Sequence, residues 1–223
     1  MGLAKRDHIR RLLQEPEVVA WWQELYGRPG NESDVDDLYE DFVPLHLACL
    51  LDHAKVIDGV LPVVDTLRSN GVRLAGTTGY TRTMLQELER ATREQGFVLE
   101  QSLCPEDVGA GRPYPFMCYQ LAVNLRVAPL SACVKVGDTF SDIQEGHNAG
   151  MWTVGVLRTG NLVGLSQQDW DALPAPEKTA VLRRAEVAIQ EHRPHFVVES
   201  VADLLPALEQ IASRIAKGEC PCS

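Results

Sequence analysis

The segment VKVGDTFSD, from Val134 to Asp142, is the most informative part of this 223-residue chain. A short β-branched run ends at Gly137, Asp138 follows directly, and Asp142 comes four residues later, where a helical pattern begins. A strand that stops at a Gly-Asp pair places its acid at the carboxyl edge of a sheet, where open α/β folds bind ligands. Two acids there form a hard oxygen site that suits Mg²⁺. We therefore predict an α/β fold with a metal site formed by Asp138 and Asp142, in which Asp138 is the stronger ligand candidate and Asp142 orients a ligand or a metal-bound water.

A plainer interpretation is that Asp138 is a turn residue and Asp142 an acid favoured by the dipole at a helix start. The residues that follow, Gly146, Asn148, Ala149 and Gly150, lead into another apolar run. This ordered spacing between two apolar strands favours the metal site over the plain turn.

Around this segment, apolar runs with strand character alternate with helical patterns. The predicted strands are 72–78, 132–137, 151–157 and 195–200, and the predicted helices are 61–69, 81–95 and 201–217. Such alternation predicts parallel βαβ units with right-handed crossovers. We expect a Rossmann-like parallel sheet over residues 52–223.

The first 51 residues have only helical periodicity. Apolar residues recur at helix spacing in 9–25, and the loop 27–34 is rich in Gly, Pro and Asn, with Ser33 as a candidate cap for a helix over 34–51. We expect residues 1–51 to form a small all-α unit attached to the α/β core.

Composition and charge limit the function. Lys and Arg number 21 against 31 Asp and Glu, which gives a net charge of −10 and little electrostatic support for nucleic-acid binding. No run approaches the ~20 apolar residues of a membrane span, and the N-terminus has no apolar signal core. The six cysteines are scattered, with Cys118 and Cys133 internal and Cys220 and Cys222 in the C-terminal tail. We therefore expect a cytoplasmic protein with reduced thiols.

Two further loops carry groups suited to a phosphate. In Thr77-Thr78-Gly79-Tyr80, a hydroxyl and free backbone N–H groups meet at a predicted helix start, which is a natural anion site; a Thr that simply caps the helix is an equal alternative for this loop alone. In GAGRPYP, from Gly109 to Pro115, Arg112 lies between a Gly-rich turn and a Pro-rich helix start. A cation in such a stiff loop is suited to pair with a phosphoryl group.

Taken in order, the threonine, arginine and paired-acid loops resemble the second, third and fourth signature motifs of the haloacid dehalogenase phosphohydrolase superfamily. The resemblance implies Thr78, Gly79, Tyr80 and Arg112 as phosphate-binding residues. The first motif, an apolar strand that ends in Asp-x-x-x-Thr and supplies the Asp that attacks phosphorus, has no match here. Asp34, Asp36 and Asp58 are poor substitutes, because polar residues or a helix flank them.

Within that superfamily, MGLAKRDHIRRLL, GTTGYTR, EDVGAGRPYPFMCY and KVGDTFSDIQEGHNAGMWTVGV look like the phosphonoacetaldehyde hydrolase (phosphonatase) family. The resemblance implies Mg²⁺, a phosphonate substrate, a homodimer formed through cap helices, and a Schiff base between the aldehyde and Lys5. It also places Met1 and His8 near the active site. Cleavage of a C–P bond needs an electron sink, which a protonated imine provides. To attack the aldehyde, Lys5 must be neutral, so its pKa must be lowered by burial or by nearby cations.

Met1 matches an internal methionine of that family, so we expect the chain to begin in mid-domain. We expect residues 1–51 to be a remnant of the helical cap, the first core strand and the first cap helix or two to be missing, and the chain to be inactive or nearly so by itself. Sheet edges and cap surfaces left without partners predict marginal stability. Two alternatives remain: another capped phosphatase or phosphomutase of the superfamily, which needs no Schiff base, and a non-catalytic relative that binds phosphonates or a partner.

Overall fold

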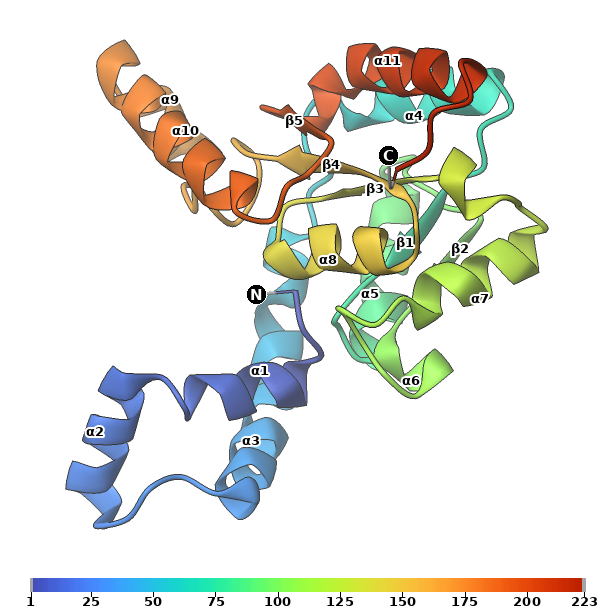
Figure 1. Ribbon diagram of the computed structural model, residues 1–223. Coiled ribbons are helices and arrows are strands. Elements are labelled where there is room, and N and C mark those ends of the chain that lie inside the picture. The colour runs from blue at the N-terminus through green and yellow to red at the C-terminus, as the bar shows by residue number, and fades with distance from the viewer. Residues whose placement is uncertain (1, 222–223) are drawn as a thin grey trace.

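The computed structural model describes residues 2–221, in which helices and strands alternate after an N-terminal group of three helices (Figure 1). The helices are α1 (Lys5–Leu12), α2 (Pro16–Tyr26), α3 (Glu32–Leu50), α4 (Val60–Ser69), α5 (Arg82–Glu94), α6 (Pro105–Val108), α7 (Phe116–Leu125), α8 (Phe140–Asn148), α9 (Gln167–Ala172), α10 (Ala175–Gln190) and α11 (Leu204–Ala216). The strands are β1 (Ala75–Thr77), β2 (Gln101–Leu103), β3 (Val134–Gly137), β4 (Trp152–Val156) and β5 (Phe196–Val198). Three short 3₁₀ helices, Leu51–His53, Leu130–Ala132 and Val201–Asp203, complete the order.

The strands form two parallel sheets, which confirms the predicted α/β class. β1 pairs with β2, and β3, β4 and β5 pair in that order. Every residue of β4, WTVGV, is buried, as expected for a parallel strand that is covered on both faces. Figure 1 shows α4 and α11 over one face of the three-stranded sheet and α8 over the other. The main core lies on the α4 and α11 side, where Val63, Val154 and Ile211 pack together.

The sheet elements differ from the prediction mainly at their ends. The predicted strand 72–78 is shorter as β1, and β2 was not predicted at all. The sequence of β2 is QSL, in which only Leu103 is fully buried, so it has no apolar alternation for a pattern to detect. Helix α10 was also missed, because its buried residues are confined to Ala185 and Ile189.

The three N-terminal helices lie apart from the sheets in Figure 1, and α3 is the one that leads back to them. α1 and α3 are joined by ion pairs from Arg6 to Asp36 and from Arg10 to Glu32. α3 begins two residues earlier than predicted, and its cap is Asn31 rather than Ser33, because the Asn31 side chain accepts hydrogen bonds from the backbone N–H groups of Ser33 and Asp34.

The chain enters α1 next to the start of α8. Gly2 has φ of 82°, and an added Cβ would lie 2.3 Å from the side-chain oxygens of Thr139 and Ser141. This close approach requires glycine, since no side chain fits there. Within residues 2–221, no helix is both long and apolar enough to cross a membrane.

Candidate active site

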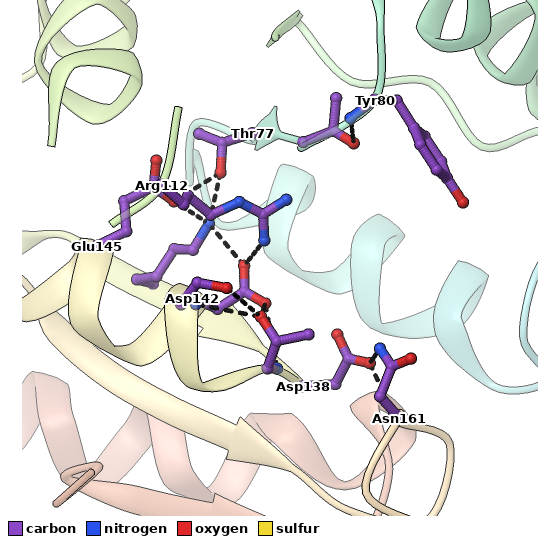
Figure 2. A network of polar contacts seen from close by, with 11 residues as sticks. Thr77, Tyr80, Arg112, Asp138, Asp142, Glu145 and Asn161 are labelled. Atoms are coloured by element: carbon purple, nitrogen blue, oxygen red, sulfur yellow. Dashed lines mark hydrogen bonds and ion pairs between the residues drawn. The ribbon is translucent and has the colours of Figure 1, made fainter. Parts of the chain in front are cut away.

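Three polar loops meet at the ends of the parallel strands (Figure 2). Thr77 ends β1 and the loop with Thr78 and Tyr80 follows it, Asp138 follows β3 directly, and Arg112 lies between α6 and α7. Figure 2 shows Thr77, Arg112, Asp138 and Asp142 in one region. Because the strands are parallel, their carboxyl ends share one edge, and this edge is where such sheets place ligand sites.

Asp142 connects two of these loops. The structure places this buried carboxylate in an ion pair with Arg112, itself only 9% exposed, and 3.2 Å from the Lys135 amine. Its other oxygen accepts hydrogen bonds from the Thr139 backbone N–H, at 3.2 Å, and from the Thr139 hydroxyl, at 2.5 Å. Burial opposes ionisation of Asp142, but Lys135 and Arg112 more than offset it and hold its pKa below the usual value. Asp142 is therefore an anion whose oxygens are both engaged by protein groups.

Lys135 extends this network to β1 and was not predicted. Its amine lies 2.6 Å from a Glu145 carboxylate oxygen and 2.5 Å from the Thr77 hydroxyl, and Thr77 donates to Glu145 at 2.8 Å. Burial lowers the pKa of Lys135, but the carboxylates of Asp142 and Glu145 more than compensate and raise it. The chain thus buries two cations and two carboxylates together, which keeps the net charge of the cluster at zero.

Asp138 is separate from this cluster. Oδ2 of Asp138 accepts hydrogen bonds from the backbone and side-chain N–H groups of Asn161, at 2.9 and 2.5 Å, while Oδ1 is engaged by no described residue. No group of three or more His, Cys, Asp or Glu side chains within residues 2–221 is arranged to hold a metal ion. Mg²⁺ in proteins is often bound by one or two carboxylates, with water and substrate phosphate as further ligands. The free oxygen of Asp138 fits that chemistry, whereas the engaged oxygens of Asp142 do not.

The threonine loop, residues 78–80, is held by its own hydrogen bonds and by close contact with the N-terminal segment. The Thr78 hydroxyl accepts a hydrogen bond from the Tyr80 backbone N–H at 3.1 Å, and the Thr78 N–H donates to the Leu103 carbonyl at 3.0 Å. A Cβ at Gly79 would lie 2.2 Å from the Leu3 carbonyl oxygen, so glycine is required where the loop meets the N-terminal segment. Thr81, not Thr78, caps α5.

Lys5 lies on the face of Tyr80, with its amine 4.5 Å from the ring centroid. Burial lowers the pKa of Lys5, and the Arg112 guanidinium lowers it further. His8, one helical turn later in α1, also has a lowered pKa, from burial and then from the positive charges of Lys5 and Arg11. The structure thus brings Lys5, Tyr80 and Arg112 into one electrostatic environment; Met1 lies outside the described residues.

His46 is a second residue that sequence reasoning missed. It lies on α3, and its ring meets the ring of Tyr80 edge-on, with 5.3 Å between centroids. Burial lowers its pKa, followed by the charge of Lys5. The helical spacing of Phe42 and His46 places both on one face of α3, but no sequence pattern shows that this face meets Tyr80.

Comparisons with known proteins agree with this arrangement. A family model described as haloacid dehalogenase-like hydrolase matches residues 3–150. A phosphonoacetaldehyde hydrolase from Syntrophobacter fumaroxidans is 44% identical over 221 residues, which are 99% of this chain and 80% of that protein. A phosphonoacetaldehyde hydrolase-like protein from the same organism is 39% identical over 99% of this chain and 80% of its own length.

Among solved structures, a phosphonoacetaldehyde hydrolase-like protein from Oleispira antarctica superimposes with a TM-score of 0.96 at 37% identity. The match covers 99% of this chain and 80% of that structure.

Proposed function

The chain belongs to the phosphonoacetaldehyde hydrolase family of haloacid dehalogenase-like hydrolases, and on that basis we propose that its site is built to cleave the C–P bond of phosphonoacetaldehyde. The products of the complete reaction are acetaldehyde and phosphate. The observation that carries this proposal is the position of Lys5, whose amine is partly buried against Tyr80 and has a lowered pKa. An ester phosphatase has no use for such an amine.

In the proposed reaction, the neutral Lys5 amine attacks the aldehyde carbon, and loss of water gives an imine. Once protonated, the imine accepts the electron pair of the C–P bond as an enamine while the phosphoryl group passes to an oxygen nucleophile. Arg112, held by Asp142, the Thr78 hydroxyl and the Gly79 backbone N–H would stabilise the phosphoryl charge. Addition of a proton to the enamine carbon gives the imine of acetaldehyde, and addition of water to that imine releases acetaldehyde and returns Lys5 to the free amine.

We assign the metal to Asp138, with its free oxygen as the protein ligand. Mg²⁺ bound there would supply Lewis-acid charge to the phosphoryl oxygens. The contacts of Asp142 support a different role for that residue, which is to fix the Arg112 guanidinium. We further propose that residues 1–51 correspond to part of the helical cap and residues 52–223 to the core.

The 223 residues contain no match to the family motif that supplies the phosphoryl acceptor. No apolar strand in the sequence ends in Asp-x-x-x-Thr, and the hydrogen-bond partner of Asp138 among the described residues is an amide, that of Asn161. We therefore expect the 223-residue chain by itself to form the imine without releasing phosphate. It would then behave as a phosphonate-binding protein, which is the second candidate function.

One experiment tests both statements. The purified chain is incubated with phosphonoacetaldehyde and borohydride, the adduct is located by peptide mass spectrometry, and phosphate release is measured without borohydride. We expect an adduct at Lys5, none in a Lys5→Arg variant, and negligible phosphate. No adduct at Lys5 in the parent chain would favour a capped phosphatase without a Schiff base, and rapid phosphate release would show that the chain supplies its own nucleophile.

A further inference from the structure

A continuous row of rings leads from α3 to the Lys5 amine. Phe42 and His46, four residues apart on α3, meet edge-on with 4.9 Å between centroids and an interplanar angle of 86°. His46 meets Tyr80 in the same way, at 5.3 Å and 89°. The amine of Lys5 lies 4.5 Å from the Tyr80 centroid. The row therefore connects two N-terminal helices through a residue of the loop that follows β1.

Each contact in the row has a favourable electrostatic geometry. The hydrogens at the edge of an aromatic ring are positive and its face is negative, so edge-to-face rings attract one another and a cation is attracted to a ring face. The orientation of the Tyr80 ring consequently determines where its negative face is available to Lys5. Among the described rings, His46 is the one that contacts Tyr80.

The other groups around Lys5 are mainly cationic. After burial, the charge of Arg112 lowers the pKa of Lys5. The charge of Lys5 in turn adds to the effect of burial in lowering the pKa of His8 and of His46. Asp138 and Cys49 influence the same environment through Tyr80, whose pKa is raised by burial first and then by these two groups. Within residues 2–221, no carboxylate lies within ion-pair distance of the Lys5 amine, and the Tyr80 face is its one specific contact. The seating of the amine thus depends on the ring.

The imidazole of His46 makes no hydrogen bond through Nδ1, although that nitrogen is buried. A phenyl ring at this position would therefore keep the edge contact to Tyr80 and lose no hydrogen bond through that atom. This feature provides a conservative variant, His46→Phe, that separates ring packing from imidazole chemistry.

We propose that His46 is a positioning residue for imine formation at Lys5: it holds the Tyr80 ring edge-on, and the face of Tyr80 in turn seats the Lys5 amine. The inference rests on the proposed function in one respect, namely that Lys5 is the lysine that forms the imine. It adds a residue of α3 to a site otherwise built from α1 and the strand-end loops.

The test is the pH dependence of borohydride trapping at Lys5 with phosphonoacetaldehyde. In His46→Ala, water gains access to the amine, so the pH midpoint of trapping should rise toward the ordinary lysine pKa of 10.5. A rise of about one pKa unit should slow trapping near pH 8 about tenfold, because about tenfold less of the amine is neutral. His46→Phe should return to within about twofold of the parent chain. His53→Ala, which removes an exposed histidine just beyond α3, is the matched control and should change nothing.

A double-variant cycle shows whether His46 acts through Tyr80. Tyr80→Leu should slow trapping, and adding His46→Ala to it should cause little further loss, because the two residues share one pathway. An unchanged midpoint in His46→Ala, a His46→Phe variant as slow as His46→Ala, or additive losses in the double variant would each overturn the proposal.

Reductive methylation of Lys5 with formaldehyde and borohydride keeps the proposal testable if the parent chain traps no phosphonoacetaldehyde. That result would reject the proposed function, yet the pH midpoint of methylation would still report the pKa of the Lys5 amine in each His46 variant. An upward shift in His46→Ala that is reversed in His46→Phe would support the positioning role, and equal midpoints would reject it. Circular dichroism of each variant checks that the helices are retained.

Discussion

At the scale of single residues, Asp142 is the most constrained group of the site. Two buried cations and one threonine contact its two oxygens. If Asp142 lost its negative charge, Glu145 would be the one buried carboxylate left in the cluster to balance Arg112 and Lys135. Removal of one member of a buried ion pair is far more costly than its net contribution suggests, because the charge left behind stays desolvated. The role of Asp142 is thus structural as well as electrostatic.

We expect Asp142→Asn to lower the free energy of unfolding by about 3–5 kcal/mol, measured by urea denaturation at pH 7. The matched control is Asp41→Asn, since Asp41 is exposed on α3 and should change stability by less than about 0.5 kcal/mol. The pKa of Asp142 is lowered from 3.8, so its stabilising contribution is present above pH 3.8 and is lost as the pH falls through the lower folded value. The difference in unfolding free energy between the parent chain and Asp142→Asn should therefore narrow only below pH 3.8. Equal unfolding free energies at pH 7 would contradict this account.

The sequence identified the residues whose neighbours along the chain reveal their chemistry. Asp138 and Arg112 each lie in a short loop with a recognisable pattern. Lys135, Glu145 and His46 carry no such signal, because their partners are distant in sequence: Thr77 is separated from Glu145 by 68 positions. In the sequence, Lys135 is a single charged residue in an apolar strand, and only the structure shows the buried carboxylates of Asp142 and Glu145 beside it.

At the scale of elements, the contact between α8 and the sheet has almost no spare room. A Cβ at Gly146 would lie 2.6 Å from Cγ2 of Thr153 and 2.8 Å from Cβ of Lys135. Both atoms are fixed near the backbone of β3 and β4, so neither can move aside cheaply. The glycine therefore sets how closely the helix that carries Asp142 approaches the sheet.

Gly146→Ala should destabilise the protein by about 1–3 kcal/mol through overpacking, even though alanine favours a helix over glycine by about 1 kcal/mol. Gln144→Ala on the exposed side of α8 is the control and should be neutral within about 0.5 kcal/mol. Thermal unfolding of both variants measures the difference. A more stable Gly146→Ala would show that the helix can shift outward without loss.

Element prediction succeeded where burial was continuous and failed where it was slight. β4 is apolar and fully buried, and its predicted range, 151–157, differs from Trp152–Val156 by one residue at each end. β2 and α10 were missed because each buries only one or two residues, so neither displays a full apolar face. The cap at Asn31 was assigned to Ser33, since both are good capping residues and only the backbone path distinguishes them.

At the scale of the whole molecule, the N-terminal helices expose large apolar side chains. Trp21, Leu25 and Tyr26 on α2 and Leu45 on α3 are 62%, 75%, 58% and 71% exposed. Leu45 lies on a different helix, and a single exposed apolar residue is ordinary, but three within residues 21–26 of α2 mark an interaction surface. We propose that this surface joins two copies of the chain into a homodimer.

The dimer proposal predicts that sedimentation equilibrium will give twice the monomer mass, and that Leu25→Glu will reduce it to the monomer by burying a charge in the interface. Val123→Glu is the matched control, because Val123 is 71% exposed and lies on α7, a helix of the α/β part of the chain and not of the N-terminal group. A parent chain that is monomeric at micromolar concentration, or a Leu25→Glu variant that stays dimeric, would contradict the proposal.

The bridge from Lys135 to Thr77 has a consequence for how the core opens. Among the described strands, no backbone ladder joins β1 to β3, so side chains of the Lys135 cluster span the two sheets. Opening of a protein proceeds through cooperative units whose internal contacts outnumber those between units. We therefore expect the β1–β2 sheet with α7 to exchange its amides as a separate unit that opens at a lower free energy than the β3–β5 sheet beneath α4 and α11, which hydrogen exchange on the chain measures.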